Sequence, residues 1–284
     1  MQILWVLIAC FILGMTAVMI YDSNRFRKVT YELESHKIKK DFRFLFLSDL
    51  HNKQYGAMNE KLLAAIDACH PEAILIGGDI LTATPGKEVA PAAEFVSVLA
   101  GKYPLYYANG NHEQRLELYP ETYGEMGVEF ERLLSEAGIH RLVNERTEDE
   151  ACGVEIVGCQ IDRQFYKRFQ KVSMPGDYLQ TVLPEKTPGM YTVLLAHNPD
   201  YFERYREWGA DLVLSGHVHG GVMRLPFFGG VIGTNFRLFP KYDGGLFRED
   251  GATMIVSRGL GAHTIPLRIW NPAELVEIVI RKTE

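Results

Sequence analysis

The sequence predicts an α/β fold, because short apolar runs alternate with helical patterns along most of the chain. Eight runs are rich in β-forming residues, and most end in a polar or glycine-containing loop: 43–48, 73–77, 104–108, 154–158, 191–196, 211–215, 253–257 and 275–280. Near-continuous apolar runs of this length are typical of strands that are buried on both faces. Strands that alternate with helices favour a largely parallel sheet with helices outside it.

Four segments between these strands have the pattern of helices: 59–69, 91–101, 129–138 and 200–209. The first offers Asn59 as an N-cap, the second begins with a proline, and the last three stop at a glycine. The chain shows no internal repeat, no low-complexity tract and no second linker. We therefore expect one catalytic domain over residues 43–284.

The first 21 residues differ from the rest. Residues 3–21 carry no charged side chain over 19 positions, which is long enough for a helix to cross a membrane. A secretory signal peptide has a basic start, a shorter apolar core and a cleavage site of small residues, and this segment lacks all three. We therefore favour an uncleaved transmembrane anchor over residues 1–21, ahead of a signal peptide or a buried core helix. A polar, basic linker is expected over residues 22–42.

The charges suggest where the domain lies. Seven basic residues follow the apolar segment: Arg25, Arg27, Lys28, Lys37, Lys39, Lys40 and Arg43. Positive flanks tend to stay in the cytoplasm, so the domain is expected on the cytoplasmic side, where these cations could also meet anionic headgroups. The net charge of −6 argues against a nucleic-acid partner. No sequence feature indicates an obligate protein partner.

Polar residues gather directly after five of the predicted strands. They are Asp49, His51, Asp79, Asn111, His112, His197, His217 and His219. Loops at the carboxyl ends of strands in an α/β sheet converge on one crevice. Carboxylate and imidazole are good ligands for Zn, Mn and Fe, and the absence of cysteine from the set argues against a structural zinc site. The D-x-H and H-x-H spacings would place both side chains on one side of an extended segment.

This set contains enough ligands for two metal ions, which one carboxylate could bridge. A pair of ions can clamp the attacking and leaving oxygens of a phosphoryl displacement, and it also acidifies a bound water.

The ordered series D-x-H, G-D, G-N-H-E, H and G-H-x-H, from Asp49 to His219, resembles the calcineurin-like metallophosphoesterase superfamily. With the apolar N-terminal segment and the "SRGLG" of residues 257–261, the chain is similar to a membrane-anchored bacterial branch related to UDP-diacylglucosamine hydrolases. The resemblance implies a four-layer αββα sandwich with two divalent ions of Mn, Zn or Fe. It also implies hydrolysis of a phosphate ester or pyrophosphate by a metal-bridging hydroxide.

The resemblance also implies a role for each residue. One metal would be held by Asp49, His51, Asp79 and His219. The other would be held by Asp79, Asn111, His197 and His217, so Asp79 is the bridge. His112 would not bind metal; it would stabilise charge on the phosphate and protonate the leaving oxygen. Glu113 would orient that imidazole.

Two rival functions remain open. The first is a metal-loaded but non-hydrolytic membrane scaffold, which has no need of His112. The second is a mononuclear oxidoreductase with an H-x-H site, which the alternation of strands and helices disfavours. Substrates compatible with the family are phosphomonoesters, phosphodiesters and pyrophosphates. A lipid-linked one is favoured by the anchor, the basic stretch and the aromatic segment 222–248.

Several other residues allow two readings. His263 could reach the cleft from a neighbouring loop. Arg258 and Asn52 could each contact phosphate or serve the fold. The basic cluster of residues 163–171 is expected to be a solvated face, in preference to a grip on the substrate. The segment 222–248 is expected to be partly core, in preference to a lipid-facing lid.

Overall fold

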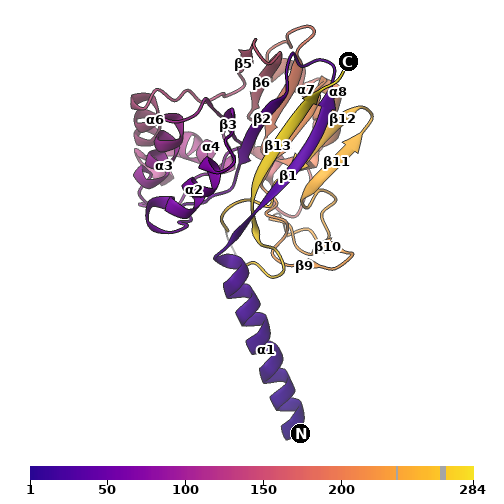
Figure 1. The fold of residues 1–284 in the computed structure, drawn as a ribbon. Coiled ribbons are helices and arrows are strands. Elements are labelled where there is room, and N and C mark those ends of the chain that lie inside the picture. Colours follow the sequence, from indigo (N-terminus) through magenta and orange to yellow (C-terminus); the bar gives the residue numbers. More distant parts are fainter. Residues whose placement is uncertain (235, 263–266) are drawn as a thin grey trace.

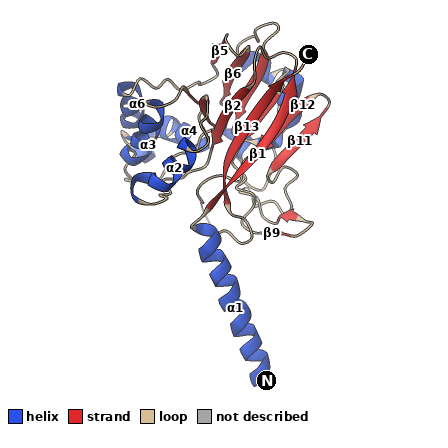
Figure 2. Ribbon diagram, viewed as in Figure 1, coloured by secondary structure: helices blue, strands red, loops and turns tan. Residues whose placement is uncertain are grey.

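The protein forms two sheets that pack face to face, with helices on both outer faces (Figures 1 and 2). The computed structural model describes residues 1–234, 236–262 and 267–284. Apolar side chains fill three layers: between the first sheet and its helices, between the two sheets, and between the second sheet and its helices. The predicted αββα sandwich is therefore confirmed.

The first sheet has the order β1-β13-β2-β3-β4. Its strands are β1 (Phe26–Ser35), β13 (Ala273–Lys282), β2 (Phe42–Leu47), β3 (Ala73–Ile76) and β4 (Leu105–Tyr107). Of its neighbouring pairs, β13 and β2 run antiparallel and the others run parallel. The loops that follow β2, β3 and β4 consequently leave the sheet at the same end, the one formed by the carboxyl ends of these strands.

The second sheet has the order β11-β12-β8-β7-β6-β5. Its strands are β11 (Gly245–Glu249), β12 (Ala252–Val256), β8 (Leu212–Ser215), β7 (Tyr191–Ala196), β6 (Val154–Cys159) and β5 (Arg146–Asp149). The four central strands are parallel, and the two edge strands are antiparallel to their neighbours. A small separate hairpin joins β9 (Arg224–Leu225) and β10 (Gly229–Gly230).

Helices cover the outer face of each sheet (Figure 2). Those on the side of the first sheet are α2 (Glu60–Asp67), α3 (Ala90–Ala100), α4 (Asn111–Leu118), α5 (Pro120–Tyr123) and α6 (Met126–Glu136). Those on the second sheet are α7 (Tyr178–Val182) and α8 (Phe202–Trp208), and short 3-10 turns occupy Ala57–Asn59, Arg163–Tyr166 and Pro199–Tyr201. All eight predicted strands and all four predicted helices are present. Asn59 occupies the predicted N-cap position of α2, but its side chain accepts a hydrogen bond from the Tyr55 amide at 2.9 Å in place of a helix amide.

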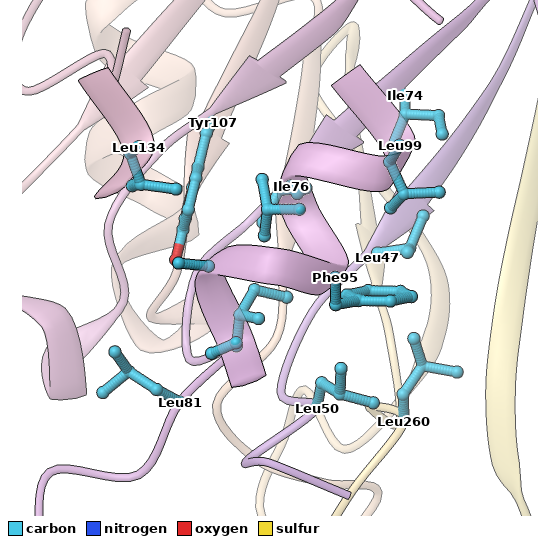
Figure 3. Packing of buried hydrophobic residues seen from close by; sticks show 14 of the residues in the cluster. Leu47, Leu50, Ile74, Ile76, Leu81, Phe95, Leu99, Tyr107, Leu134 and Leu260 are labelled. Carbon is cyan, nitrogen blue, oxygen red and sulfur yellow. The ribbon is translucent and has the colours of Figure 1, made fainter. Parts of the chain in front are cut away.

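The core under the first sheet holds the strand ends in place. Leu47 and Ile76, the last residues of β2 and β3, pack with Phe95 and Leu99 of α3 (Figure 3). All four side chains are buried, and each such burial stabilises the fold by about 1.5–3 kcal/mol. The polar loops that follow these strands therefore start from rigid positions.

The segment 22–42 is not a linker, because it contains β1. This strand pairs with β13 over ten residues at the edge of the first sheet. Polar and apolar side chains alternate along it, with Leu33 buried, which is the pattern of an edge strand with one wet face. A search for continuous apolar runs does not detect such a strand.

The basic residues of this segment contact the domain. Lys39 donates to the backbone oxygen of Glu150, and the other six form ion pairs with acidic side chains. Arg27 pairs with Glu274 at 2.8 Å and Lys28 with Glu277 at 3.1 Å, and both glutamates lie on β13 with less than 5% of their side chains exposed. These pairs attach β1 to the sheet, so the cations serve the fold whether or not they also meet headgroups.

The helix α1 (Gln2–Ser23) is long and apolar enough to cross a membrane, and it projects away from the sandwich near β9 and β10 (Figure 1). Its last turn is tied to the domain. Asp22 is 2% exposed and accepts hydrogen bonds from the Asn271 amide at 3.1 Å and from Arg25. The end of the apolar helix is therefore part of the folded unit.

We predict that the position of an N-terminal truncation decides whether the domain folds. Removing residues 1–21 keeps β1 and Asp22, whereas removing residues 1–40 exposes the unpaired edge of β13 and the contacts of Leu33. We expect the second truncation to lower the free energy of unfolding by about 3 kcal/mol or more relative to the first. Urea unfolding followed by circular dichroism measures the difference, and equal midpoints would show that β1 is dispensable.

Candidate metal centre

The polar loops of both sheets meet at one place. Asp49 and His51 follow β2, Asp79 follows β3, and Asn111 begins α4 after β4. His197 follows β7, while His217 and His219 follow β8. The aspartates and His197 are at most 2% exposed, although Asp49 and His197 lie 148 positions apart along the chain. The predicted convergence is therefore what the structure shows.

Three ligand atoms meet around Asp49. The Nε2 atom of His219 lies 3.3 Å from Asp49 Oδ1 and 3.2 Å from His51 Nε2. His51 Nε2 lies 3.8 Å from the same carboxylate oxygen. Ligands that each lie about 2.0–2.2 Å from one ion are about 3–4 Å apart. These three atoms therefore fit one cation.

A second group forms around Asp79. His197 Nε2 lies 3.1 Å from Asp79 Oδ2, and His217 offers a ring nitrogen within 4.8 Å of both. The same Asp79 oxygen lies 3.8 Å from His51 Nε2, so Asp79 stands between the two groups. Asn111 lines the cleft that contains them. The carboxylate of Asp79 could therefore contribute to both groups.

The acceptors that remain unpaired point to a positive ligand. In the described part of the chain, Asn111 Oδ1 and His197 Nε2 are buried and make no well-aligned hydrogen bond. His197 Nδ1 lies 2.7 Å from the Gly77 carbonyl, to which it donates, so Nε2 is the atom that offers a lone pair to a cation once the ring has lost its second proton. Buried acceptors without donors are costly unless something positive contacts them. The residues present therefore fit divalent metal.

The electrostatics of the cluster agree with this. Burial lowers the pKa of His197, but Asp79 and Asp49 outweigh it and raise that pKa to about 10. Burial and the neighbouring His197 hold the pKa of His217 well below its usual value. Burial would raise the pKa of Asp79, yet the imidazoles around it, His197 foremost, lower it strongly. The two carboxylates thus favour a cation at this spot.

The backbone of these loops is left-handed at most of the ligand positions. Positive φ angles between 51° and 67° occur at Asp49, His51, Asp79, His217 and His219. The expectation of an extended D-x-H and H-x-H segment is therefore wrong. Residues with side chains avoid this region unless the surroundings hold them there, and such strain concentrates at functional sites. In the H-x-H loop it sends His217 and His219 to different groups, while Val218 is buried.

Two glycines allow the carboxylates to approach the backbone. A Cβ atom at Gly110 would overlap the Asp79 carboxylate, and one at Gly216 would overlap that of Asp49. In their absence, Asp79 Oδ1 accepts the His112 amide at 2.8 Å, and both oxygens of Asp49 accept the His217 amide at 3.1 Å. Each aspartate is therefore oriented by an amide from a neighbouring loop.

His112 lies at the start of α4, and it forms a third candidate metal group with His51 and Asp79. Its ring centroid is 5.0 Å from that of His51. Its Nδ1 accepts the Ala83 amide at 2.9 Å, so in the neutral ring the proton resides on Nε2. Nε2–H is the group that a proton donor needs.

Glu113 supports the loops; its contacts do not match the expected role of orienting His112. Its two oxygens accept four hydrogen bonds of 2.8–3.0 Å, from the amides of Asp79, Ile80 and Gly110 and from the Tyr107 hydroxyl. Burial, together with the charge of Asp79, raises the pKa of Glu113 to about 7. Glu113 therefore fixes the loop that carries Asp79. The G-N-H-E spacing pointed to this residue but not to its partner.

Arg258 and Asn52 both contact other groups of the protein. Arg258 forms an ion pair with Glu274 at 3.2 Å, and Asn52 accepts the Thr82 amide at 2.7 Å, so both serve the fold. The cluster 163–171 is not wholly a solvated face, because Arg163 and Arg168 line the metal cleft. The segment 222–248 is mixed: Tyr242 is buried and Phe227 is fully exposed. His263 lies outside the described residues.

Comparison with known proteins agrees with this centre. A model of the calcineurin-like phosphoesterase family matches residues 42–221. The metallophosphoesterase YkuE of Bacillus subtilis is 24% identical, over 85% of this chain and 80% of that protein. The phosphodiesterase YaeI of Escherichia coli is 29% identical over 70% of each. A transmembrane protein with a metallophosphoesterase domain from Danio rerio is 29% identical, over 84% of this chain and 53% of that protein.

The family match covers well over half of the chain and includes all the residues that gather at the strand ends. The chain belongs to the calcineurin-like phosphoesterase family and is a metal-dependent phosphoric ester hydrolase.

Proposed function

We propose that the protein is a dinuclear phosphoesterase tethered to a membrane by α1. The observation that carries the proposal is the pair of adjoining ligand groups that share the neighbourhood of Asp79. Asp49, His51, Asp79 and His219 would hold one ion. The second ion would be held by Asp79, Asn111, His197 and His217.

Two divalent cations at these positions would supply Lewis acidity toward a phosphate and toward the water that attacks it. The protein's own part is orientation. The His112 and His217 amides hold the two carboxylates, and Glu113 fixes the Asp79 loop. Such fixed positions remove the cost of reorganisation during the reaction.

His112 is the proposed proton donor. The Ala83 amide occupies Nδ1 and leaves the proton on Nε2, from which the ring would hydrogen-bond the leaving-group oxygen of a phosphate held by the proposed metal ligands. A donor in this position also stabilises negative charge on the phosphate before it gives up its proton. A metal-binding scaffold without turnover has no use for it.

A lipid-linked substrate and a cytoplasmic domain are part of the proposal. Exposed apolar side chains lie in the segment around β9 and β10 and near the end of α1: Phe227, Phe228, Leu238, Phe239 and Trp270. These elements lie on the side from which α1 leaves the domain (Figure 1). Aromatic side chains favour the interface between membrane and water. The membrane would then be close to the cleft.

Metal binding should depend on pH through His197. At neutral pH its raised pKa means that the ring holds a proton, which a cation must displace, whereas His217 and His219, with lowered pKa values, are already neutral. We expect the affinity for the ion at His197 to rise about tenfold per pH unit between about pH 6 and about pH 9. Calorimetric titration with Mn²⁺ in buffers of different ionisation enthalpy counts the protons released. A count of zero would contradict this assignment.

The variant His112→Ala tests the role of the proton donor. We expect it to keep two metal ions per chain, measured by elemental analysis, and to lose about 10²–10⁴-fold in kcat, because only the proton donor is removed. The variant His140→Ala, which changes an exposed histidine outside the cleft, serves as the control. Full turnover by His112→Ala would favour another donor, and one ion per chain would revive the mononuclear alternative.

The lipid preference is tested by comparing kcat/KM for a soluble nitrophenyl phosphate, a phospholipid and a nucleotide-linked lipid. With the full chain in detergent micelles, we expect the lipid substrates to be preferred by about tenfold or more, because their acyl chains add apolar burial at about 0.8 kcal/mol per methylene. Equal values for soluble and lipid substrates would contradict a lipid-linked substrate while leaving the phosphoesterase intact.

A further inference from the structure

Three arginines line the cleft that holds the metal residues. Arg115 comes from α4, and Arg163 and Arg168 come from the segment after β6. The same three side chains line an adjoining hollow that extends toward Tyr119 and Thr122. They therefore stand where the metal cleft opens outward, beyond His112.

Arg115 and Arg163 are partly buried and Arg168 is exposed, and none of the three has an ion-pair or hydrogen-bond partner within the described residues, whereas three other arginines do. Arg141 pairs with Glu117, Arg258 pairs with Glu274, and Arg268 donates to backbone carbonyls. By contrast, the Nε and Nη1 atoms of Arg163 are buried and make no hydrogen bond in the described structure. Buried guanidinium nitrogens without acceptors are costly, so this site is shaped for an anion.

Aromatic rings hold the three guanidinium groups in place. Arg115 lies over the ring of Tyr123 at 5.6 Å, Arg163 over Tyr166 at 5.5 Å and Arg168 over Phe236 at 5.6 Å. A guanidinium group over the face of a ring can still donate from its N–H groups, which lie in its own plane. Tyr166 also contacts the metal site, with its ring centroid 5.2 Å from that of His217.

We infer that Arg115, Arg163 and Arg168 form a second anion subsite, which binds a phosphate group of the substrate other than the one that is hydrolysed. This inference rests on the proposed function, since the scissile phosphate is taken to lie over the metal residues. Planar guanidinium groups match phosphate oxygens in pairs. The preferred substrates are therefore phosphate compounds with a second phosphoryl group nearby, such as organic diphosphates or bisphosphates.

The test compares inorganic phosphate with pyrophosphate as inhibitors of nitrophenyl phosphate hydrolysis. The full chain is used in detergent with Mn²⁺, and free metal is held constant. We expect Arg163→Gln to raise the inhibition constant of pyrophosphate by about tenfold or more and that of phosphate by about threefold or less. Arg163→Lys, which keeps the charge but loses the planar fork, should fall between Arg163→Gln and the wild type.

Lys167→Gln is the matched control, because it removes a charge from the same segment without touching the lining of the cleft. It should leave both constants unchanged, and circular dichroism verifies that each variant is folded. An equal change in both constants for Arg163→Gln, or no change in either, overturns the subsite.

The failure of the proposed function would be visible separately. If the wild type hydrolyses no phosphate ester with any metal, calorimetric titration of pyrophosphate into wild type and Arg163→Gln still decides the inference. Weaker binding to the variant by about tenfold or more supports the subsite, and equal binding overturns it.

Discussion

The centre of this protein is organised by the close approach of two buried carboxylates. Asp49 and Asp79 are almost completely buried and both lie within 4 Å of His51 Nε2. Two negative charges in a region of low dielectric repel each other and lose their hydration, unless positive charge stands between them. The raised pKa of His197 has the same origin, because the two carboxylates stabilise the positive charge of its protonated ring. A divalent metal ion would offset the repulsion between the two carboxylates more strongly than a proton does, because it carries more positive charge. Metal-dependent hydrolysis, the chemistry of the family, uses this arrangement.

The backbone of the surrounding loops holds the two carboxylates in place. Each aspartate is placed in a left-handed conformation by the loop that follows a buried strand. The strands are fixed by apolar packing against α3, and the loop carrying Asp79 is fixed by Glu113. These contacts fix the positions of the aspartates, so the sheets act mainly as a rigid base for short polar loops.

The strands and the gathering of polar residues at their ends could be predicted from sequence because each has a local signal. Continuous apolar runs marked eight strands, and the polar residues directly after them marked the centre. β1 could not be predicted in this way, because an edge strand alternates polar and apolar residues. The basic residues in and around it also gave it the composition of a linker. The contacts of Glu113 and the place of Arg163 in the cleft depend on long-range packing, which spacing does not encode. The left-handed turns are not predictable either, since Asp and His are enriched in this region but adopt it at only a minority of their positions.

The packing around Asn271 joins the anchor to the centre. Asp22, at the end of α1, accepts the amide of Asn271. The side chain of Asn271 is fully buried and donates to the carbonyl oxygens of His219 and Gly221, in the loop that carries two of the proposed ligands. A buried residue whose backbone and side-chain amides both donate hydrogen bonds is costly to displace. A single residue, Asn271, thus connects the H-x-H loop to the last turn of the apolar helix. For this reason Asp22 and the last turn of the apolar helix belong to the same folded unit as the H-x-H loop.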